Sequence, residues 1–521
     1  MTNSVVTALQ AVASEPEAAQ TLPLMPGTAE ATGGWLTALT GWVEAADGWV
    51  WGGPLVTAIL LVGLYLTARL RFAHLFNLRR AFGFIFAKDG AAKGDVSPFA
   101  ALCTALSATI GTGNIVGVAT AIGTGGPGAL FWMQVAAFVG MATKYAEGLL
   151  AVKFREILPD GRVLGGPFMY IEKGLGPKFR PLAKAFALFG AMAGIMGIGT
   201  LAQIHGITSA VQRFFDPGFN PADMSTGVQV FGTTYSTAVV VAGFVVTLCV
   251  GLVVIGGLRR IARVATVIVP FMAAFYILAC GFILLGNLSK ISAAIELVVR
   301  AAFNPAAFTG GLVGSLFVAV QMGVARGIFS NEAGLGSEPI AAAAARTNEP
   351  ARQGFVCMTG TFFDTIVVCT MTGLAIVITG AWEPSLGLKG VDITIAAFNR
   401  GLSFLPKSDF VAPCFLMVSL ALFAFTTILG WNYYSERCLE YLVGQRRQWL
   451  TRVFRFAYVA VVFAGPYFTV SVVWSVADVF NGLMAFPNLV ALVLLSPVVV
   501  DVTRDFLRRE GAKSGAQPRA M

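Results

Sequence analysis

The feature that most constrains this chain is its series of long apolar segments. One of them, TAVVVAGFVVTLCVGLVVIG (237–256), runs for about 20 residues without a charged side chain, which is long enough for a helix that crosses the hydrocarbon core of a bilayer. Across the chain, 56% of the residues are hydrophobic and 12% are charged. The helices of a large soluble protein keep a polar face, and these segments lack one. The sequence therefore predicts an all-α polytopic membrane protein.

About eleven segments qualify as transmembrane helices. An odd number places the two termini on opposite sides of the membrane. Loops on the side reached by the first helix hold most of the 36 Lys and Arg residues, an excess typical of cytoplasmic loops. We therefore expect a multi-pass protein of the cell (inner) membrane, with the N-terminus outside and the C-terminus in the cytoplasm. The basic charge is expected to face membrane lipid rather than nucleic acid. The segments are approximately 52–72, 97–123, 126–152, 183–212, 234–256, 262–286, 312–344, 354–381, 410–436, 453–471 and 474–502.

The chain has few residues that could support redox or metal chemistry. It has two histidines, His74 and His205, and seven cysteines without a CxxC pair. No clustered nucleophile, metal-ligand pattern or nucleotide motif is evident. These observations argue against an integral-membrane enzyme and predict no cofactor other than a coupling ion.

Two of the apolar segments are interrupted at corresponding places. Segment 97–123 is broken by GTGN at 111–114, and segment 312–344 is broken within GVARGIFSNEAGLGS at 323–337. With the first helix set aside, the remaining ten helices divide into two sets of five of opposite orientation, each opening with a broken helix. The predicted organisation is an extracellular tail, an extra helix with its linker, two inverted repeats and a cytoplasmic tail, at 1–51, 52–96, 97–311, 312–503 and 504–521.

Breaking a helix inside a membrane requires a reason. Unwinding leaves backbone N–H and C=O groups without partners, at a cost of several kcal/mol each in hydrocarbon. A bound substrate and bound ions can replace those partners, and paired breaks in two halves of a carrier indicate a site near the midplane. Glycine can instead serve close helix packing. The recurrence of the break in both halves favours a binding site, and a carrier over a channel.

Four motifs in order resemble the alanine or glycine:cation symporter family. They are GTGNIVGVATAIGTGGPGALFWM (111–133), KYAEGLLAVKFRE (144–156), GGPFMYIEKGLG (165–176) and GIFSNEAGLGSEPIAAAAARTNEPARQG (327–354). The resemblance covers about residues 52–505. It implies the leucine-transporter fold, with five plus five helices in an inverted repeat, and symport of small neutral amino acids with sodium.

The resemblance also implies a substrate site at the breaks. The backbone of the first break is expected to bind the substrate carboxylate, with an amide nearby, and the second broken helix is expected to form the opposite wall. Gln203 could contact substrate or bridge helices, and Trp431 could cap the pocket or mark an interface. The implied substrate-binding residues are Gly111, Thr112, Gly113, Asn114, Gln203, Gly327, Phe329, Ser330, Asn331 and Trp431.

A sodium site is expected where Thr426 and Thr427 meet the end of the first half-helix. Hydroxyl and carbonyl oxygens suit a hard cation, so the candidate ligands are the two threonines with Ser107 and Ile110. The alternative is that the threonines bond back to their own helix, as membrane threonines often do.

Charged residues at membrane depth are costly and usually functional. Asp364 and Glu332 could each pair with Arg326, bias a cation site or carry a proton. Lys144 and Glu147 are three residues apart and could pair. The sequence thus predicts sodium-coupled import of alanine or glycine, with a proton-coupled carrier of the same fold as the alternative.

Overall fold

The computed structural model describes residues 41–514, except for residues 44, 47, 52, 88–91, 198, 221–226, 231, 304–315, 445–446 and 468–470. Most of the predicted N-terminal tail, 1–51, and the last seven residues of the predicted cytoplasmic tail lie outside this part of the chain. The described residues are almost entirely helical, with two short hairpins, β1–β2 and β3–β4. The prediction of an all-α fold is confirmed for them.

The first half of the chain contains the first broken helix and a long, largely buried helix, α8 (Gly128–Lys153). Its elements are α3 (Gly53–Arg69), α4 (Ala73–Phe76), α5 (Leu78–Ile85), α6 (Pro98–Thr109), the 3-10 turn η1 (Thr112–Asn114), α7 (Val116–Gly125), α8 (Gly128–Lys153), β1 (Glu156–Ile157), β2 (Val163–Leu164), α9 (Pro167–Leu175), η2 (Pro177–Phe179), α10 (Arg180–Met196), α11 (Leu201–Phe215), β3 (Gly227–Val230), β4 (Thr233–Ser236), α12 (Thr237–Val254), α13 (Leu258–Gly286) and α14 (Leu288–Phe303).

The second half contains the second broken helix and a π-helical segment. Its elements are α16 (Leu316–Asn331), α17 (Glu338–Ala342), α18 (Pro350–Thr361), the π-helix η3 (Phe362–Cys369), α19 (Thr370–Ile378), η4 (Pro384–Leu386), α20 (Val391–Gly401), α21 (Ser408–Val443), α22 (Gln448–Ala464), η6 (Gly465–Tyr467), α23 (Ser471–Leu494) and α24 (Ser496–Ser514).

Seven helices of the described chain are long and apolar enough to cross a membrane, or nine if each of two bent pairs counts as one span. The pair α6 and η1–α7 bends by 66°, as the first interruption predicts. The second bent pair, α23 and α24, bends by 58°, where the sequence predicts one continuous helix at 474–502. Two further helices, α14 and α20, fall in segments predicted as loops.

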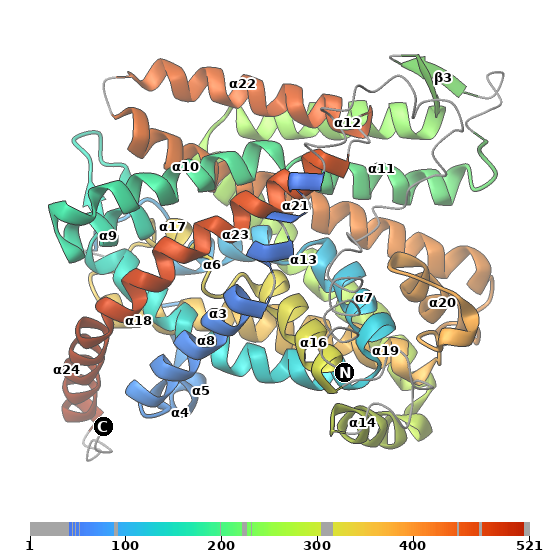
Figure 1. Cartoon of the computed structure of the whole chain (residues 1–521), viewed down its shortest axis with the longest axis horizontal. Helices are drawn as coiled ribbons and strands as arrows, with labels where there is room; N and C mark the ends of the chain where they lie inside the picture. The colour runs from blue at the N-terminus through green and yellow to red at the C-terminus, as the bar shows by residue number, and fades with distance from the viewer. Residues whose placement is uncertain are drawn as a thin grey trace.

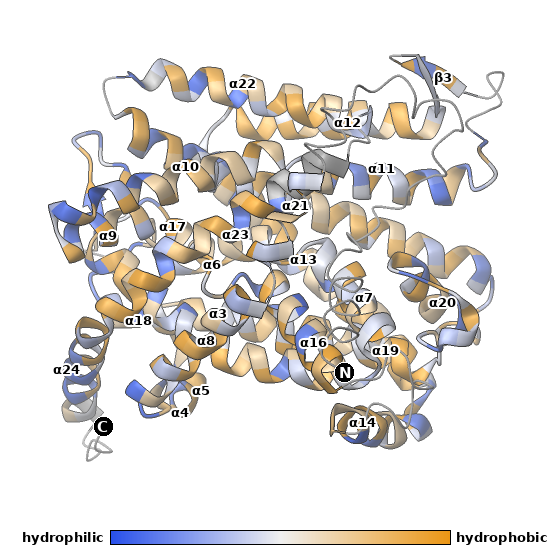
Figure 2. Cartoon of the chain, viewed as in Figure 1, coloured by the Kyte–Doolittle hydropathy of each residue, from blue (hydrophilic) through white to orange (hydrophobic). Residues whose placement is uncertain are grey.

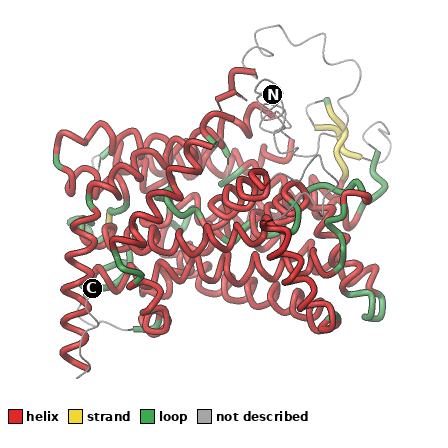
Figure 3. The backbone as a smooth tube through the Cα atoms, turned by 60° about the horizontal axis from the view of Figure 1, so that its bottom comes forward, coloured by secondary structure: helices red, strands yellow, loops and turns green. Residues whose placement is uncertain are grey.

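The helices lie side by side, with β3 and β4 standing out at one edge (Figure 3). In Figure 1, α6 lies in the middle of the helix array, whereas α12 and α22 form one border. Figure 2 shows apolar residues along these border helices. On α12 and α13, Phe244 is 58% exposed and Phe271 is 60% exposed, while Tyr276 is fully buried. Apolar side chains thus cover both the interior and the outer surface, as a lipid-facing protein requires.

Candidate substrate and sodium site

The first break lies between α6 and α7 and is built from the GTGN sequence. Ser97 caps α6 by accepting a hydrogen bond from the Ala100 N–H (3.1 Å). At the other end of α6 the backbone becomes extended at Ile110 and Gly111. The Asn114 side chain then turns back, and its Oδ1 accepts the Gly111 N–H at 2.9 Å. A side-chain oxygen therefore replaces one of the helical partners that the break removes.

The approach of α21 explains why position 111 is glycine. A Cβ added to Gly111 would lie 2.7 Å from Oγ1 of Thr427. At Gly113 an added Cβ would meet only ordinary contacts, 3.5 Å from Cα of Ser330 and 3.6 Å from the Phe329 ring. Gly111 thus lets the first break contact α21, whereas at Gly113, beside the second broken helix, an alanine would also fit.

The second break follows α16 and precedes the short helix α17. Three residues in it have positive φ, namely Glu332 (55°), Gly334 (89°) and Gly336 (83°). Glycine adopts this conformation freely, whereas a left-handed glutamate is strained and needs support. Trp431 Nε1 donates to Oε1 of Glu332 at 3.1 Å, and the Ser337 hydroxyl donates to Oε2. The break predicted within 323–337 is therefore present at its C-terminal end.

A small cavity joins the two breaks. Its empty space, including the part open to the outside, is about 250 Å³. Six of the sequence-predicted residues line it: Gly111, Thr112, Gly113, Gln203, Phe329 and Thr427. The remaining lining residues are Ala108, Thr109 and Glu332.

The other predicted substrate residues lie next to this cavity without lining it. Gly327 faces α8, and a Cβ there would lie 3.2 Å from Cγ of Met133, so it serves helix packing. Trp431 is buried and reaches the pocket through its hydrogen bond to Glu332. Neither Asn114 nor Ser330 lines the pocket, and their side chains bond to residues of the π-helix η3.

These two side chains meet at Asp364, in the π-helix η3. Asn114 Nδ2 donates to Oδ1 of Asp364 at 2.7 Å, and the Ser330 hydroxyl donates to Oδ2 at 2.9 Å. The Thr365 hydroxyl also donates to Oδ2 at 2.7 Å, and Asn331 Nδ2 donates to that hydroxyl at 3.1 Å. A fully buried carboxylate thus connects both breaks through neutral donors.

The comparisons with known proteins identify the kind of carrier. The sequence matches the sodium:alanine symporter family over residues 36–520. The chain belongs to this family. The symporter is 44% identical to the sodium/alanine symporter AgcS of Methanococcus maripaludis, over 89% of this chain and 97% of that one. It is 35% identical to a putative sodium/proton-dependent alanine carrier protein of Bacillus subtilis, over 90% of this chain and 92% of the relative.

A solved structure agrees on the fold. The crystal structure of MhsT in complex with L-phenylalanine superposes on this symporter with a TM-score of 0.51 and 13% sequence identity, covering 79% of this chain and 99% of that chain. The likeness shows the leucine-transporter fold that the motifs imply. The predictions of the family, of a sodium-coupled amino-acid symporter and of a transporter rather than an enzyme are confirmed.

Of the two threonines among the predicted sodium ligands, Thr427 lies closer to the break. Its hydroxyl is the atom that excludes a Cβ at Gly111, and it also donates to the Phe423 carbonyl of its own helix at 2.9 Å. The Thr426 hydroxyl bonds back to Leu422 at 3.1 Å and faces α13. Both threonines thus make the bonds within their own helix that the alternative interpretation describes, but only Thr427 also borders the cavity.

The first half-helix supplies the other two predicted ligands. Ser107 donates to the Thr104 carbonyl at 2.7 Å, and its Oγ would lie 2.8 Å from a Cβ on Gly430 of α21. Ile110 is the last residue before the break and is buried. The site therefore remains a prediction that centres on the contact between α6 and α21.

Lys144 does not pair with Glu147, the partner that the sequence spacing suggests. Its Nζ lies 2.6 Å from Oε2 of Glu338 in α17, and both side chains are almost completely buried. Glu147 instead accepts a hydrogen bond from Asn488 Nδ2 of α23 at 2.6 Å. Asn488 also donates to the carbonyl of Gly334 at 2.9 Å. This network supports the second break from α8 and α23.

Sequence reasoning missed several members of this site. Thr109 lines the cavity but looks like any small residue of an apolar helix. Thr365 is 34 residues from Asn331, whose amide donates to its hydroxyl, and Asn488 reaches Glu147 over 341 residues. A polar residue within an apolar run is the available signal for Asn488, since a buried amide requires partners.

Proposed function

We propose that this symporter imports alanine or glycine together with sodium. The observation that carries the proposal is the small cavity between the two breaks, bounded by the backbone of Gly111 and Gly113 and by the Phe329 ring. A wall made of backbone and one aromatic ring limits the size of the side chain that a substrate bound between the breaks can carry. Relatives named for sodium and alanine support the same substrate class.

Within the cavity, the two charged groups of an amino acid have different partners. Backbone N–H groups at the start of a half-helix favour an anion, so we assign the carboxylate to the stretch Gly111 to Gly113, beside Asn114. The carboxylate of Glu332 and the amide of Gln203 line the same cavity and are suited to the substrate ammonium. Sodium is assigned to Ser107, Ile110, Thr426 and Thr427.

The proposed topology has eleven membrane spans. An extra helix precedes two inverted repeats of five helices, 97–311 and 312–503. The excess of Lys and Arg on one set of loops supports an external N-terminus and a cytoplasmic C-terminus in the inner membrane. The short helices α14 and α20, which carry Glu296 and Asp392, are assigned to the outer face.

Proton coupling is the second candidate. A specific observation favours testing it: Asp364 is buried among neutral donors, with Asn114, Ser330 and Thr365 as its partners. Such a carboxylate can be balanced by a sodium ion or by a proton.

One experiment separates the two. The purified protein is reconstituted in liposomes, and alanine uptake is measured with sodium, potassium or pH gradients imposed one at a time. Uptake that follows the sodium gradient supports the proposal. Robust uptake on a pH gradient in the absence of sodium contradicts it, and counterflow of preloaded alanine distinguishes a carrier from a channel.

A further inference from the structure

Glu332 brings a carboxylate into the cavity between the two breaks. Among the described residues that line this cavity it is the only charged one, and it is 2% exposed. Its two oxygens accept hydrogen bonds from neutral donors, Nε1 of Trp431 at 3.1 Å and the hydroxyl of Ser337. No cationic side chain of the described chain forms an ion pair with it. The charge of this carboxylate is therefore uncompensated at close range.

The nearby cation, Lys144, is already engaged. Its Nζ lies 2.6 Å from Oε2 of Glu338. A further carboxylate of this region, Glu147, accepts a hydrogen bond from the Asn488 amide at 2.6 Å, while its Oε2 has no hydrogen-bond partner among the described residues. Lys144 can balance one of the three carboxylates, so two negative charges remain in excess in the buried surroundings of the second break.

The other titratable groups around Glu332 form no ion pair with it. The Tyr434 hydroxyl has no partner in the described part of the chain, and Asp364, beyond Ser330, adds a negative charge of its own. The Arg326 guanidinium lies over the ring of Phe329, 5.9 Å from its centroid. The titratable and charged groups around Glu332 are thus Lys144 and Glu147 of α8, Arg326 of α16, Glu338 of α17, Asp364 of η3 and Tyr434 of α21.

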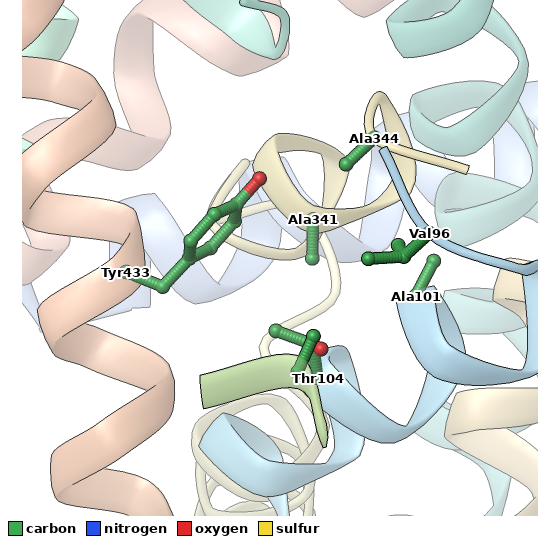
Figure 4. A pocket seen from close by; sticks show the side chains of 7 residues that line it. Val96, Ala101, Thr104, Ala341, Ala344 and Tyr433 are labelled. Carbon is green, nitrogen blue, oxygen red and sulfur yellow. The ribbon is translucent and has the colours of Figure 1, made fainter. Parts of the chain in front are cut away.

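A second small cavity in the structure has no such charge. It lies between α6, α13, α21 and the segment around α17, and Tyr433 reaches toward α17 (Figure 4). The Tyr433 hydroxyl donates to the Ile340 carbonyl at 3.2 Å, and the Thr104 hydroxyl donates to the Ala100 carbonyl at 2.8 Å. An uncompensated charge therefore distinguishes the cavity between the breaks. The residues that line the second cavity are Val96, Ala101, Thr104, Ala262, Ala341, Ala344 and Tyr433.

A buried carboxylate without a cation is disfavoured as an anion. Removing its charge from water costs so much free energy that such a group takes up a proton instead. The hydrogen bonds at Glu332 indicate where the proton resides. Trp431 Nε1 can only donate, so Oε1 stays an acceptor, whereas the Ser337 hydroxyl can donate or accept. The proton therefore belongs on Oε2, where the Ser337 hydroxyl turns to accept it.

We propose that Glu332 is a site for one monovalent cation, a proton when the cavity is empty and the ammonium group of alanine when it is occupied. On alanine entry the O–H bond of the Glu332 carboxyl breaks, the proton passes to water, and the carboxylate pairs with the ammonium. The two cations compete for one charge, so each weakens the binding of the other by the same factor. This inference rests on the proposed function, since it takes alanine as the substrate of this cavity.

Release of the proton can be measured directly. The purified protein, at a fixed saturating sodium concentration, is titrated calorimetrically with alanine in pairs of buffers that differ in their enthalpy of ionisation. The dependence of the observed heat on the buffer gives the number of protons released. We expect the release to rise toward one proton per alanine as pH is lowered from about 7.5 to about 5. Alanine binding with no proton release anywhere in this range would overturn the proposal.

The affinity for alanine provides a second measurement. Over the same range, the dissociation constant should increase about tenfold for each unit by which pH falls below the midpoint, because the competing proton becomes ten times more concentrated. Alanine keeps its ammonium group throughout, so its own charge does not change. A dissociation constant that stays the same over the whole range would contradict the competition.

A matched pair of variants locates the proton. Glu332→Gln keeps the size of the side chain but cannot ionise, so alanine should bind at least about tenfold more weakly at the upper end of the pH range and without proton release. Glu147→Gln removes another buried carboxylate, one that does not line the cavity, and should retain the release. Release that persists in Glu332→Gln, or that Glu147→Gln abolishes, would assign the proton elsewhere and overturn the proposal.

Trp431→Phe locates the proton even where Glu332→Gln binds alanine too weakly to titrate. It removes the Nε1 donor from Oε1 and keeps an aromatic ring, so the anionic carboxylate loses a hydrogen bond. The pH at which alanine affinity starts to fall should therefore rise by about one unit.

Tyr434→Phe is the control for this shift. The Tyr434 ring lies 5.7 Å from that of Trp431, between centroids, and its hydroxyl makes no hydrogen bond within the described residues, so the variant should leave the pH dependence unchanged. No shift in Trp431→Phe, or an equal shift in both variants, would refute the assignment of the proton to Glu332.

The proposed function and this inference fail in different ways. Wild-type protein that neither binds alanine nor takes it up on a sodium gradient refutes the proposed function. Alanine that binds and is transported without proton release refutes the exchange at Glu332 alone.

Discussion

The amide of Asn114 and the carboxylate of Asp364 form a hydrogen bond of 2.7 Å between residues 250 positions apart. Asn114 belongs to the first break, and the same carboxylate accepts from Ser330, beside the second break. The buried carboxylate of Asp364 thus accepts hydrogen bonds from residues of both broken helices. Its environment connects the proposed substrate site at the breaks to whichever cation balances the carboxylate.

We predict that Asp364→Asn keeps sodium-driven uptake but raises the sodium concentration for half-maximal uptake about tenfold, which corresponds to about 1.4 kcal/mol. The reason is that the variant removes the negative charge and retains the side-chain size. Thr365→Val is the control, because it removes one donor to the same carboxylate, and it should change the sodium requirement less than threefold. Uptake by Asp364→Asn with wild-type sodium dependence would contradict the prediction.

The two threonines of the predicted sodium site have different surroundings in the structure. Thr427 borders the cavity, whereas the Thr426 hydroxyl faces Met272 at 3.3 Å. Thr427→Val should raise the sodium needed for half-maximal uptake more than tenfold, because a desolvated ion loses an oxygen ligand. Thr426→Val, the matched control, should have a smaller effect. Equal sodium dependence in all three folded proteins would remove both threonines from the site.

The size of the cavity predicts selectivity. Gly113→Ala places a methyl group in ordinary contact with Phe329 and Ser330, so we expect a folded transporter that loses alanine before glycine. Phe329→Ala should enlarge the pocket and admit serine or valine. Competition of glycine, alanine, serine, valine and leucine with labelled alanine measures both effects. Leucine that competes with the wild type as well as alanine does would contradict the small pocket.

Lys144 and Glu338 should contribute unequally to stability. Lys144→Met leaves Glu147, Glu332 and Glu338 without their nearest cation, so we expect a loss of about 3–5 kcal/mol, typical of a broken buried ion pair. Glu338→Gln leaves two carboxylates near Lys144 and should cost less. Thermal unfolding in detergent compares them, with Lys173→Gln as the exposed control. A larger loss of stability in Glu338→Gln than in Lys144→Met would contradict this prediction.

His74 predicts a pH dependence of stability. It lies in α4, outside the membrane spans, and burial lowers the pKa of His74 to about 4. Neither ring nitrogen has a hydrogen-bond partner among the described residues. The unfolded chain takes up this proton near pH 6.5 and the folded chain near 4, so stability falls between these values as pH drops, by up to about 3 kcal/mol.

The measurement is the midpoint of thermal unfolding against pH, for the wild type and His74→Leu. The difference between the two proteins should be constant above pH 7 and should shift in favour of His74→Leu as pH falls from 6.5 to 4. Parallel curves over the whole range would show that His74 does not titrate with unfolding.

The sequence predicted the first break closely, because the glycines and the asparagine that build it are adjacent along the chain. Part of the pocket also follows from the first break, because three consecutive residues of that break, Gly111 to Gly113, line the pocket. Positive φ occurs at Glu332, Gly334 and Gly336 of the second break, while Gly113 of the first break has none.

Contacts between distant segments were harder to predict. Lys144 pairs with Glu338 rather than with nearby Glu147, because α17 packs on α8. Gly327 packs against Met133 instead of lining the pocket, and a glycine offers no side chain that would distinguish these roles. The helices α14 and α20 were overlooked because amphipathic segments resemble polar loops when long apolar runs define the spans.

The π-helical segment η3 has a consequence for comparing this chain with its relatives. Asp364 and Cys369 are five residues apart, and residues at that spacing in a regular α-helix point in different directions. In η3 both contact Asn114 Nδ2, at 2.7 and 3.4 Å. A π-turn is equivalent to a one-residue insertion into an α-helix. A homologue that lacks one residue between these two positions would therefore need an alignment gap there, and without it every following residue would be matched to the wrong helix face.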